Sequence, residues 1–413
     1  MRRGDETAEA AAEAVARRSY GKLVAFLAAR SRDVAASEDA LAEAFASALA
    51  SWPETGVPDN PEAWLLQAAR RRLIDATRRR KTAEEAEPHV RLIAEEMEAN
   101  AMETRFPDER LGLMFACAHP AIDPAVRAPL ILQTILGFDA AAIGSAFLVS
   151  PAAMGQRLVR AKTRIKDAGI PFRVPDAADL PARLEAVLDA IYAAFAEGWN
   201  DPAGTEVRRR DLAEEAIWLG RLVASLLPDE PEALGLLALM LHAEARRAAR
   251  RTAQGGYVPL GEQDVLLWDH VMIDEAERLL HQASRLRIPG RYQLEAAVQS
   301  AHSIRRRGGD ADWPAIVSLY DALTTMTSSP VVAINRAVAL AEVEGAEAGL
   351  SALDALADDP RLRDYQPYWA ARAGLLSRAK NISEAGEAYE RAIGLEADPA
   401  VRRFLQERRE ALR

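Results

Sequence analysis

The residues best suited to chemistry lie in a basic segment that begins at Ser150-Pro151. This dipeptide is typical of a helix start, because serine caps the first turn and proline is tolerated at its first position. An apolar face is predicted at Met154, Leu158, Ala161 and Ile165. The other side carries amide and basic groups, which can bond base edges in the DNA major groove, after two small residues that allow close approach. These candidates are Ala152, Ala153, Gln156, Arg157, Arg160 and Lys162.

The element expected to position this helix is a preceding short apolar helix, 140–148, in which Gly144 leaves room for a crossing helix. Residues 139–166 are therefore predicted to form a helix-turn-helix whose second helix enters the major groove. The alternative is a basic amphipathic helix whose charges are only solvated.

A second basic helix is predicted over 61–81, where Asn60 caps the start and Pro61 occupies the first helical position. Trp64 lies on its apolar face, while arginines cover the remainder in the runs 70–72 and 78–80. Basic residues beside an aromatic suit phosphate neutralisation and contact with unstacked bases of single-stranded DNA. Taken alone, Trp64 is predicted to be a core residue rather than a stacking platform. An amphipathic helix over 37–52, acidic in its first turn, is predicted to lie at the surface.

The composition indicates an all-α protein without a disulfide framework. Ala, Leu, Glu and Arg dominate the 413 residues, and strand-like alternation is absent. The net charge of −10 arises after residue 175, because the first 175 residues hold 24 basic and 24 acidic side chains. Cys117 and His119 lie in an apolar stretch without a second pair nearby, so they are predicted to pack rather than bind metal. No membrane span or signal peptide is expected, and the predicted location is the cytoplasm.

Four segments follow from the pattern of helices, prolines and charge. A three-helix segment spans 10–83, an acidic linker 84–108, a compact helical unit 109–172, and an acidic, alanine-rich helical part 180–413. Within the last part, 330–400 has the spacing of a tetratricopeptide repeat, in which small residues let paired helices approach. The positions that carry this spacing are Trp369, Ala373, Leu376, Ala385, Tyr389 and Ala392.

Several ordered blocks resemble the extracytoplasmic-function sigma factors of the sigma-70 family. They include the Ser-Glu-Asp-Ala run at 37–40, Pro-Glu-Ala-Trp-Leu at 61–65, Ile-Asp-Ala-Thr-Arg-Arg-Arg at 74–80 and the terminal helix-turn-helix. Phe-Ala-Cys-Ala-His-Pro at 115–120 and Asn-Arg-Ala-Val-Ala at 335–339 are similar to one group with a long tetratricopeptide-like extension. The resemblance implies two small helical sigma domains followed by that extension, without a cofactor.

The resemblance also implies a role for each matching residue. Core RNA polymerase would be bound through its β′ clamp by Asp39, Leu41, Glu43 and Phe45, and through its β flap. The −10 promoter element would be held as single strand by Trp64, Arg71, Asp75, Arg78 and Arg79. The −35 element would be read by the candidates of the helix that begins at Pro151, which are Ala152, Ala153, Gln156, Arg157, Arg160 and Lys162. The extension is expected to contact the sigma domains or another protein and to regulate them.

Two other functions remain open at the level of the residues. A stand-alone helix-turn-helix regulator with a ligand-sensing helical domain would bind duplex DNA without polymerase. A scaffold would depend on the repeats and would tolerate loss of Arg157 and Arg160. An enzyme is disfavoured, since the sequence has no paired carboxylates, nucleophile motif or phosphate loop.

Overall fold

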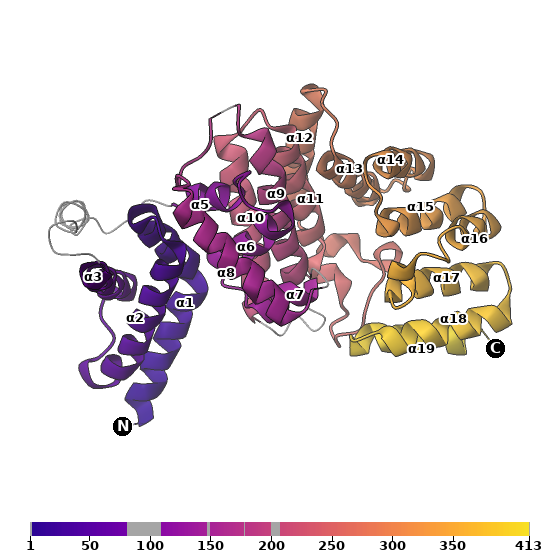
Figure 1. The fold of residues 1–413 in the computed structure, drawn as a ribbon. Helices are drawn as coiled ribbons and strands as arrows, with labels where there is room; N and C mark the ends of the chain where they lie inside the picture. The colour runs from indigo at the N-terminus through magenta and orange to yellow at the C-terminus, as the bar shows by residue number, and fades with distance from the viewer. Residues whose placement is uncertain (1, 81–108, 147–148, 177, 200–206, 413) are drawn as a thin grey trace. The chain divides into compact units, whose positions relative to one another are not determined.

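The computed structural model describes residues 2–80, 109–146, 149–176, 178–199 and 207–412 (Figure 1). Throughout these ranges the chain is α-helical with short 3-10 helices, and its one β-type pairing is an isolated bridge between Arg251 and Tyr257. The all-α prediction is therefore confirmed. None of the described helices is long and apolar enough to cross a membrane. The chain divides into two compact units, Met1–Ala194 and Phe195–Arg413.

Unit 1 begins with three helices, α1 (Arg2–Ser31), α2 (Val34–Thr55) and α3 (Pro61–Arg80). The Asp33 carboxylate caps α2 by accepting the Ala36 N–H at 3.0 Å. The Asn60 side chain accepts the Ala63 N–H at 3.0 Å, which confirms the helix start predicted there. Helix α2 turns its small and apolar residues inward, from Val34 to Trp52 at helical spacing.

The second half of unit 1 contains α5 (Arg110–Cys117), α6 (Pro124–Leu136), α7 (Ala140–Ala146), α8 (Pro151–Asp167) and the start of α9 (Pro181–Trp199). Helix α1 meets α6 at Gly21, where an added Cβ would lie 1.9 Å from the Ile135 carbonyl oxygen. The two backbones therefore touch, and this contact joins the helices before residue 81 to those after residue 108. Cys117 is buried with its Sγ 3.6 Å from the Thr134 hydroxyl, as the packing prediction requires.

The turn between α7 and α8 depends on Gly144. The Val149 N–H donates to the Gly144 carbonyl at 2.8 Å, and a Cβ at Gly144 would lie 2.6 Å from the Val149 oxygen. The glycine thus makes room for the backbone of the turn itself rather than for a crossing helix. Ser150 caps α8 by accepting the Ala153 N–H, and Pro151 is the first helical residue, as predicted.

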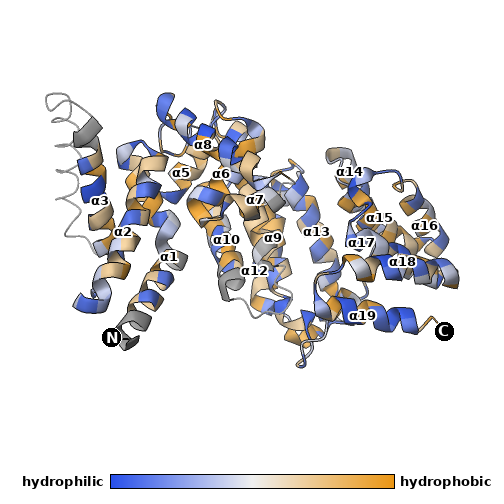
Figure 2. Ribbon diagram, turned by 60° about the horizontal axis from the view of Figure 1, so that its bottom comes forward, coloured by the Kyte–Doolittle hydropathy of each residue, from blue (hydrophilic) through white to orange (hydrophobic). Residues whose placement is uncertain are grey.

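Unit 2 is a succession of packed helices, hydrophobic where they meet (Figure 2). They are α10 (Val207–Leu226), α11 (Pro231–Glu244), α12 (His270–Arg285), α13 (Arg291–Ser303), α14 (Trp313–Met326), α15 (Pro330–Val343), α16 (Ala346–Asp354), α17 (Gln366–Arg378), α18 (Ile382–Leu395) and α19 (Pro399–Glu410). Helix α11 is buried along nearly its whole length. Helix α19 is mostly hydrophilic, and Leu405 is its buried residue.

The positions predicted to form a tetratricopeptide-like repeat share one hydrophobic core. Ala373 and Leu376 of α17 are buried with Ala385, Tyr389 and Ala392 of α18, and Trp369 packs against them. The predicted small residues thus lie where the two helices meet. Membership of that repeat class stays a prediction.

Candidate nucleic-acid interface

Helix α8 has one buried face and one exposed face. The buried residues are the four predicted, Met154, Leu158, Ala161 and Ile165. Among the −35 candidates, Ala152, Gln156 and Arg160 are exposed, and Ala153 and Arg157 are half-buried. Five of the six candidates therefore share the accessible side of the helix.

Lys162, the sixth candidate, does not face solvent. Its ammonium group pairs with the Glu38 carboxylate of α2, and the two side chains are 10% and 15% exposed. Lys166, one turn further, pairs with Asp33 at 2.7 Å. Burial raises the pKa of Glu38, and the Lys162 charge acts in the opposite direction. The basic edge of α8 is thus held by α2 in this conformation, and Lys162 has to leave Glu38 before it can contact DNA.

The residues predicted to bind polymerase on α2 do not form one surface. Asp39 and Glu43 are exposed and Phe45 is half-buried, but Leu41 is fully buried. Leu41 therefore shapes the core of unit 1 and is not accessible to a partner here. Glu43 pairs with Arg72 of α3, whose guanidinium also donates to the Ser47 hydroxyl at 2.8 Å.

The arginine run of α3 is divided between core and surface. Arg70 turns inward, with its guanidinium carbon 4.8 Å from the centre of the Phe26 ring, and burial lowers its pKa to about 10. Arg71 and the candidate Asp75 are exposed. The side chains of Arg78 and Arg79, also predicted to hold the −10 element, lie outside the described residues.

The aromatic candidate of α3 lies at the edge of the core. Trp64 is half-buried, and its ring packs edge-on against Trp52, with centroids 5.5 Å apart. Trp52 itself is buried. One side of the Trp64 ring therefore packs on the protein, as a core position requires. The rest of the side chain stays accessible, as a contact with unstacked bases would require.

Sequence reasoning missed two residues of the exposed face of α8. Val159 and Thr163 are exposed and continue the line of Ala152 and Gln156 at spacings of four, three and four residues. That spacing is the signal that could have found them, because residues so spaced lie on one side of a helix.

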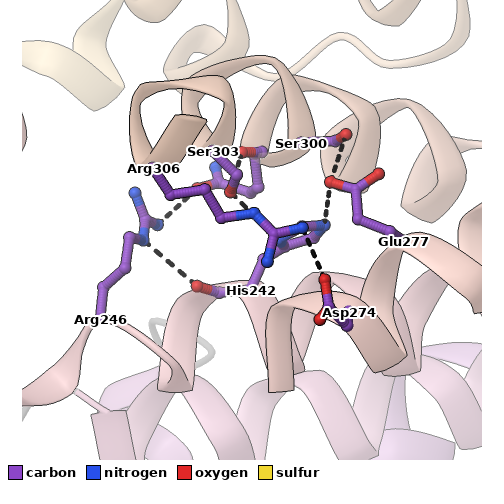
Figure 3. Close-up of polar contacts among 8 residues, drawn as sticks. His242, Arg246, Asp274, Glu277, Ser300, Ser303 and Arg306 are labelled. Carbon is purple, nitrogen blue, oxygen red and sulfur yellow. Dashed lines mark hydrogen bonds and ion pairs between the residues drawn. The ribbon is translucent and has the colours of Figure 1, made fainter. Parts of the chain in front are cut away.

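A buried polar cluster in unit 2 joins α11, α12 and α13 (Figure 3). The His242 ring is fully buried, with Nδ1 3.3 Å from the Ser303 hydroxyl and Nε2 3.7 Å from Glu277, which accepts the Ser300 hydroxyl at 2.7 Å. Burial lowers the pKa of His242 to about 3, so the ring is neutral at physiological pH.

Arginines enclose this cluster. Arg246 donates to the His242 carbonyl at 3.2 Å and to the Gln299 side chain, and Arg306 pairs with Asp274 at 2.6 Å (Figure 3). No set of three or more potential metal ligands occurs within the described ranges. The contacts of the cluster connect three helices.

The comparisons with known proteins place this arrangement in a family. Residues 15–83, which cover most of α1 and all of α2 and α3, match the family described as sigma-70 region 2. Residues 183–284 match a family of unknown function (DUF6596). An uncharacterized protein of Rhizobium meliloti (strain 1021) is 40% identical over 381 residues, covering 91% of this chain and 89% of that protein. No solved structure matches. The region 2 match supports a sigma factor of the sigma-70 family.

Proposed function

We propose that the chain is an RNA polymerase sigma factor of the extracytoplasmic-function type that recognises promoter −10 and −35 elements and supports initiation. The observation that carries the proposal is the region 2 match over α1–α3 in a chain that also exposes the basic helix α8. In this assignment α2 contacts the β′ clamp of core polymerase. Helix α3 holds the melted −10 element with Trp64, Arg71 and Asp75, while α8 reads the −35 element.

The division of labour follows from tethering. Each DNA-contacting helix alone offers few side chains and would bind weakly. When both helices are carried by one polymerase, each has a high effective concentration at its own element, so correctly spaced elements are favoured. The chemistry of RNA synthesis belongs to the polymerase, and the chain contributes positioning and strand separation.

Residues 180–413 are proposed to regulate the two DNA-contacting segments. The part of the chain after residue 175 carries the entire acidic excess, 38 acidic against 28 basic residues, whereas the first 175 residues are balanced. An acidic partner can compete with DNA for basic helices, and such competition weakens with salt. Truncation near Pro175 should therefore change the amount of transcript or the promoters used.

Transcription with purified components tests the proposal. The full chain is mixed with core polymerase of the encoding bacterium and fragmented genomic DNA, and the 5′ ends of the transcripts are sequenced. We expect specific starts that need both the chain and Arg160, with Arg378→Ala of α17 as a control for removing one arginine. Gel shifts with and without core polymerase separate the proposal from a stand-alone regulator, which would bind duplex DNA equally in both. An absence of specific starts would refute the proposal.

A further inference from the structure

The exposed side of α8 has an uncharged stripe between two charged edges. The stripe consists of Ala152, Gln156, Val159 and Thr163. At 3.6 residues per turn, Arg157, Arg160 and Arg164 fall on one side of it, and Lys162 and Lys166 fall on the other. A helix lying in the major groove has a sugar–phosphate backbone on each side and base edges in front. The uncharged stripe therefore matches the bases and the arginine edge matches one line of phosphates, while the lysine edge can match the other once Lys162 leaves Glu38.

Val159 is the unusual member of this stripe. It is 65% exposed in the middle of a polar face, where a β-branched apolar side chain adds nothing to packing and is a weaker helix former than alanine. Thr163 donates its hydroxyl to the Val159 carbonyl at 3.1 Å, so this hydroxyl is already bonded within the helix. Gln156 supplies an amide to the stripe, and its neighbours along the stripe present methyl groups.

We propose that Val159 is a specificity-determining residue that contacts the C5-methyl group of a thymine in the −35 element. The thymine methyl is the apolar group that base pairs present in the major groove, so it is the natural partner of an exposed aliphatic side chain. Arg160 and Arg164 then contact phosphates and contribute affinity without reading sequence. The inference rests on the proposed function, since it assumes that α8 lies on the −35 element.

Deoxyuridine substitution tests the methyl contact directly. The preferred −35 sequence is first selected from randomised duplexes with the full chain and core polymerase. Each thymine of the selected sequence is then replaced singly by deoxyuridine, which lacks only the C5-methyl group. We expect one position at which the replacement weakens binding about fourfold, the value of burying one methyl-sized group. In Val159→Ala the same replacement should have no further effect.

Two variants serve as controls. Val331→Ala removes another exposed valine, from α15, and should keep the full deoxyuridine penalty. Arg160→Ala should weaken all sequences alike and lower the salt dependence, as expected for a phosphate contact. A penalty that persists in Val159→Ala, or no sensitive thymine in a selected sequence, overturns the inference and leaves the proposed function standing. If no sequence is enriched with polymerase present, the proposed function fails, and the inference fails with it.

Discussion

The ion pairs between α8 and α2 predict how the chain binds duplex DNA without polymerase. Glu38 holds Lys162 and Asp33 holds Lys166, so two of the positive charges of α8 are neutralised in this conformation. The double variant Asp33→Asn, Glu38→Gln removes both carboxylates while keeping their shapes. Asparagine caps helices as well as aspartate, so the start of α2 should be retained.

The expected effect follows from counterion release. Each lysine that moves to a phosphate steepens the dependence of log K on log salt by about 0.9, so two lysines add about 1.8. Between 50 and 200 mM salt, the affinity of the double variant should therefore fall about twelve times more than that of the wild type. In the wild type these two lysines contribute less to the salt dependence of DNA binding, because the Lys162 side chain is only 10% exposed.

Fluorescence anisotropy with a random-sequence duplex measures the two slopes. The matched control is Glu214→Gln, Asp229→Asn, which changes the net charge equally at two exposed acidic residues of unit 2. Adding Lys162→Gln and Lys166→Gln to the double variant should return the slope to the wild-type value or below. Equal slopes for the double variant and its control would show that the ion pairs do not withhold these lysines from DNA.

Other predictions concern stability. Gly21→Ala places a Cβ against the Ile135 backbone and should destabilise unit 1 by about 1–3 kcal/mol in urea, whereas Gly155→Ala, which meets no atom closer than 3.9 Å, should stabilise it by about 0.5–1 kcal/mol. His242 should account for about 2 kcal/mol of the stability that the wild type loses between pH 8 and pH 5, because unfolded His242, at its ordinary pKa, binds a proton that the folded form, with a pKa of about 3, does not bind. The loss should be smaller by this amount in His242→Gln, where the half-buried His302 still contributes, and should keep its wild-type size in His270→Gln. Arg70→Met should keep or raise stability, because methionine removes a desolvated charge; a clear loss in urea unfolding would contradict that reasoning.

Local features of unit 1 were predictable because their causes lie within a few residues. The cap at Ser150, the proline after it and the apolar spacing from Met154 to Ile165 determine where α8 begins and which side it buries. The start of α3 at Asn60-Pro61 follows from the same rules. These signals depend on one helix at a time, so the sequence alone contains them.

Contacts between distant helices were not predictable in this way. The Lys162–Glu38 pair joins residues 124 positions apart, and nothing near either residue indicates the other. Arg70 stands in a run of arginines that indicates a surface, yet the packing of α3 turns it toward Phe26. A leucine at position 41 is compatible with either a docking surface or a core. The packing of α1 and α3 on α2 places Leu41 in the core.

The Glu38–Lys162 pair links the helix proposed to bind polymerase to the helix proposed to bind DNA. Burial disfavours the Glu38 charge, and Lys162 compensates for it. When α8 separates from α2, Glu38 returns to solvent beside the exposed Asp39 of α2. A partner that binds α2 and a partner that binds α8 therefore each favour the separated arrangement of these two helices. Such coupling is reciprocal, so polymerase should raise the DNA affinity of α8 by the factor by which DNA raises polymerase affinity. In Glu38→Gln the separated arrangement requires breaking only the Asp33–Lys166 pair, and both factors should shrink together.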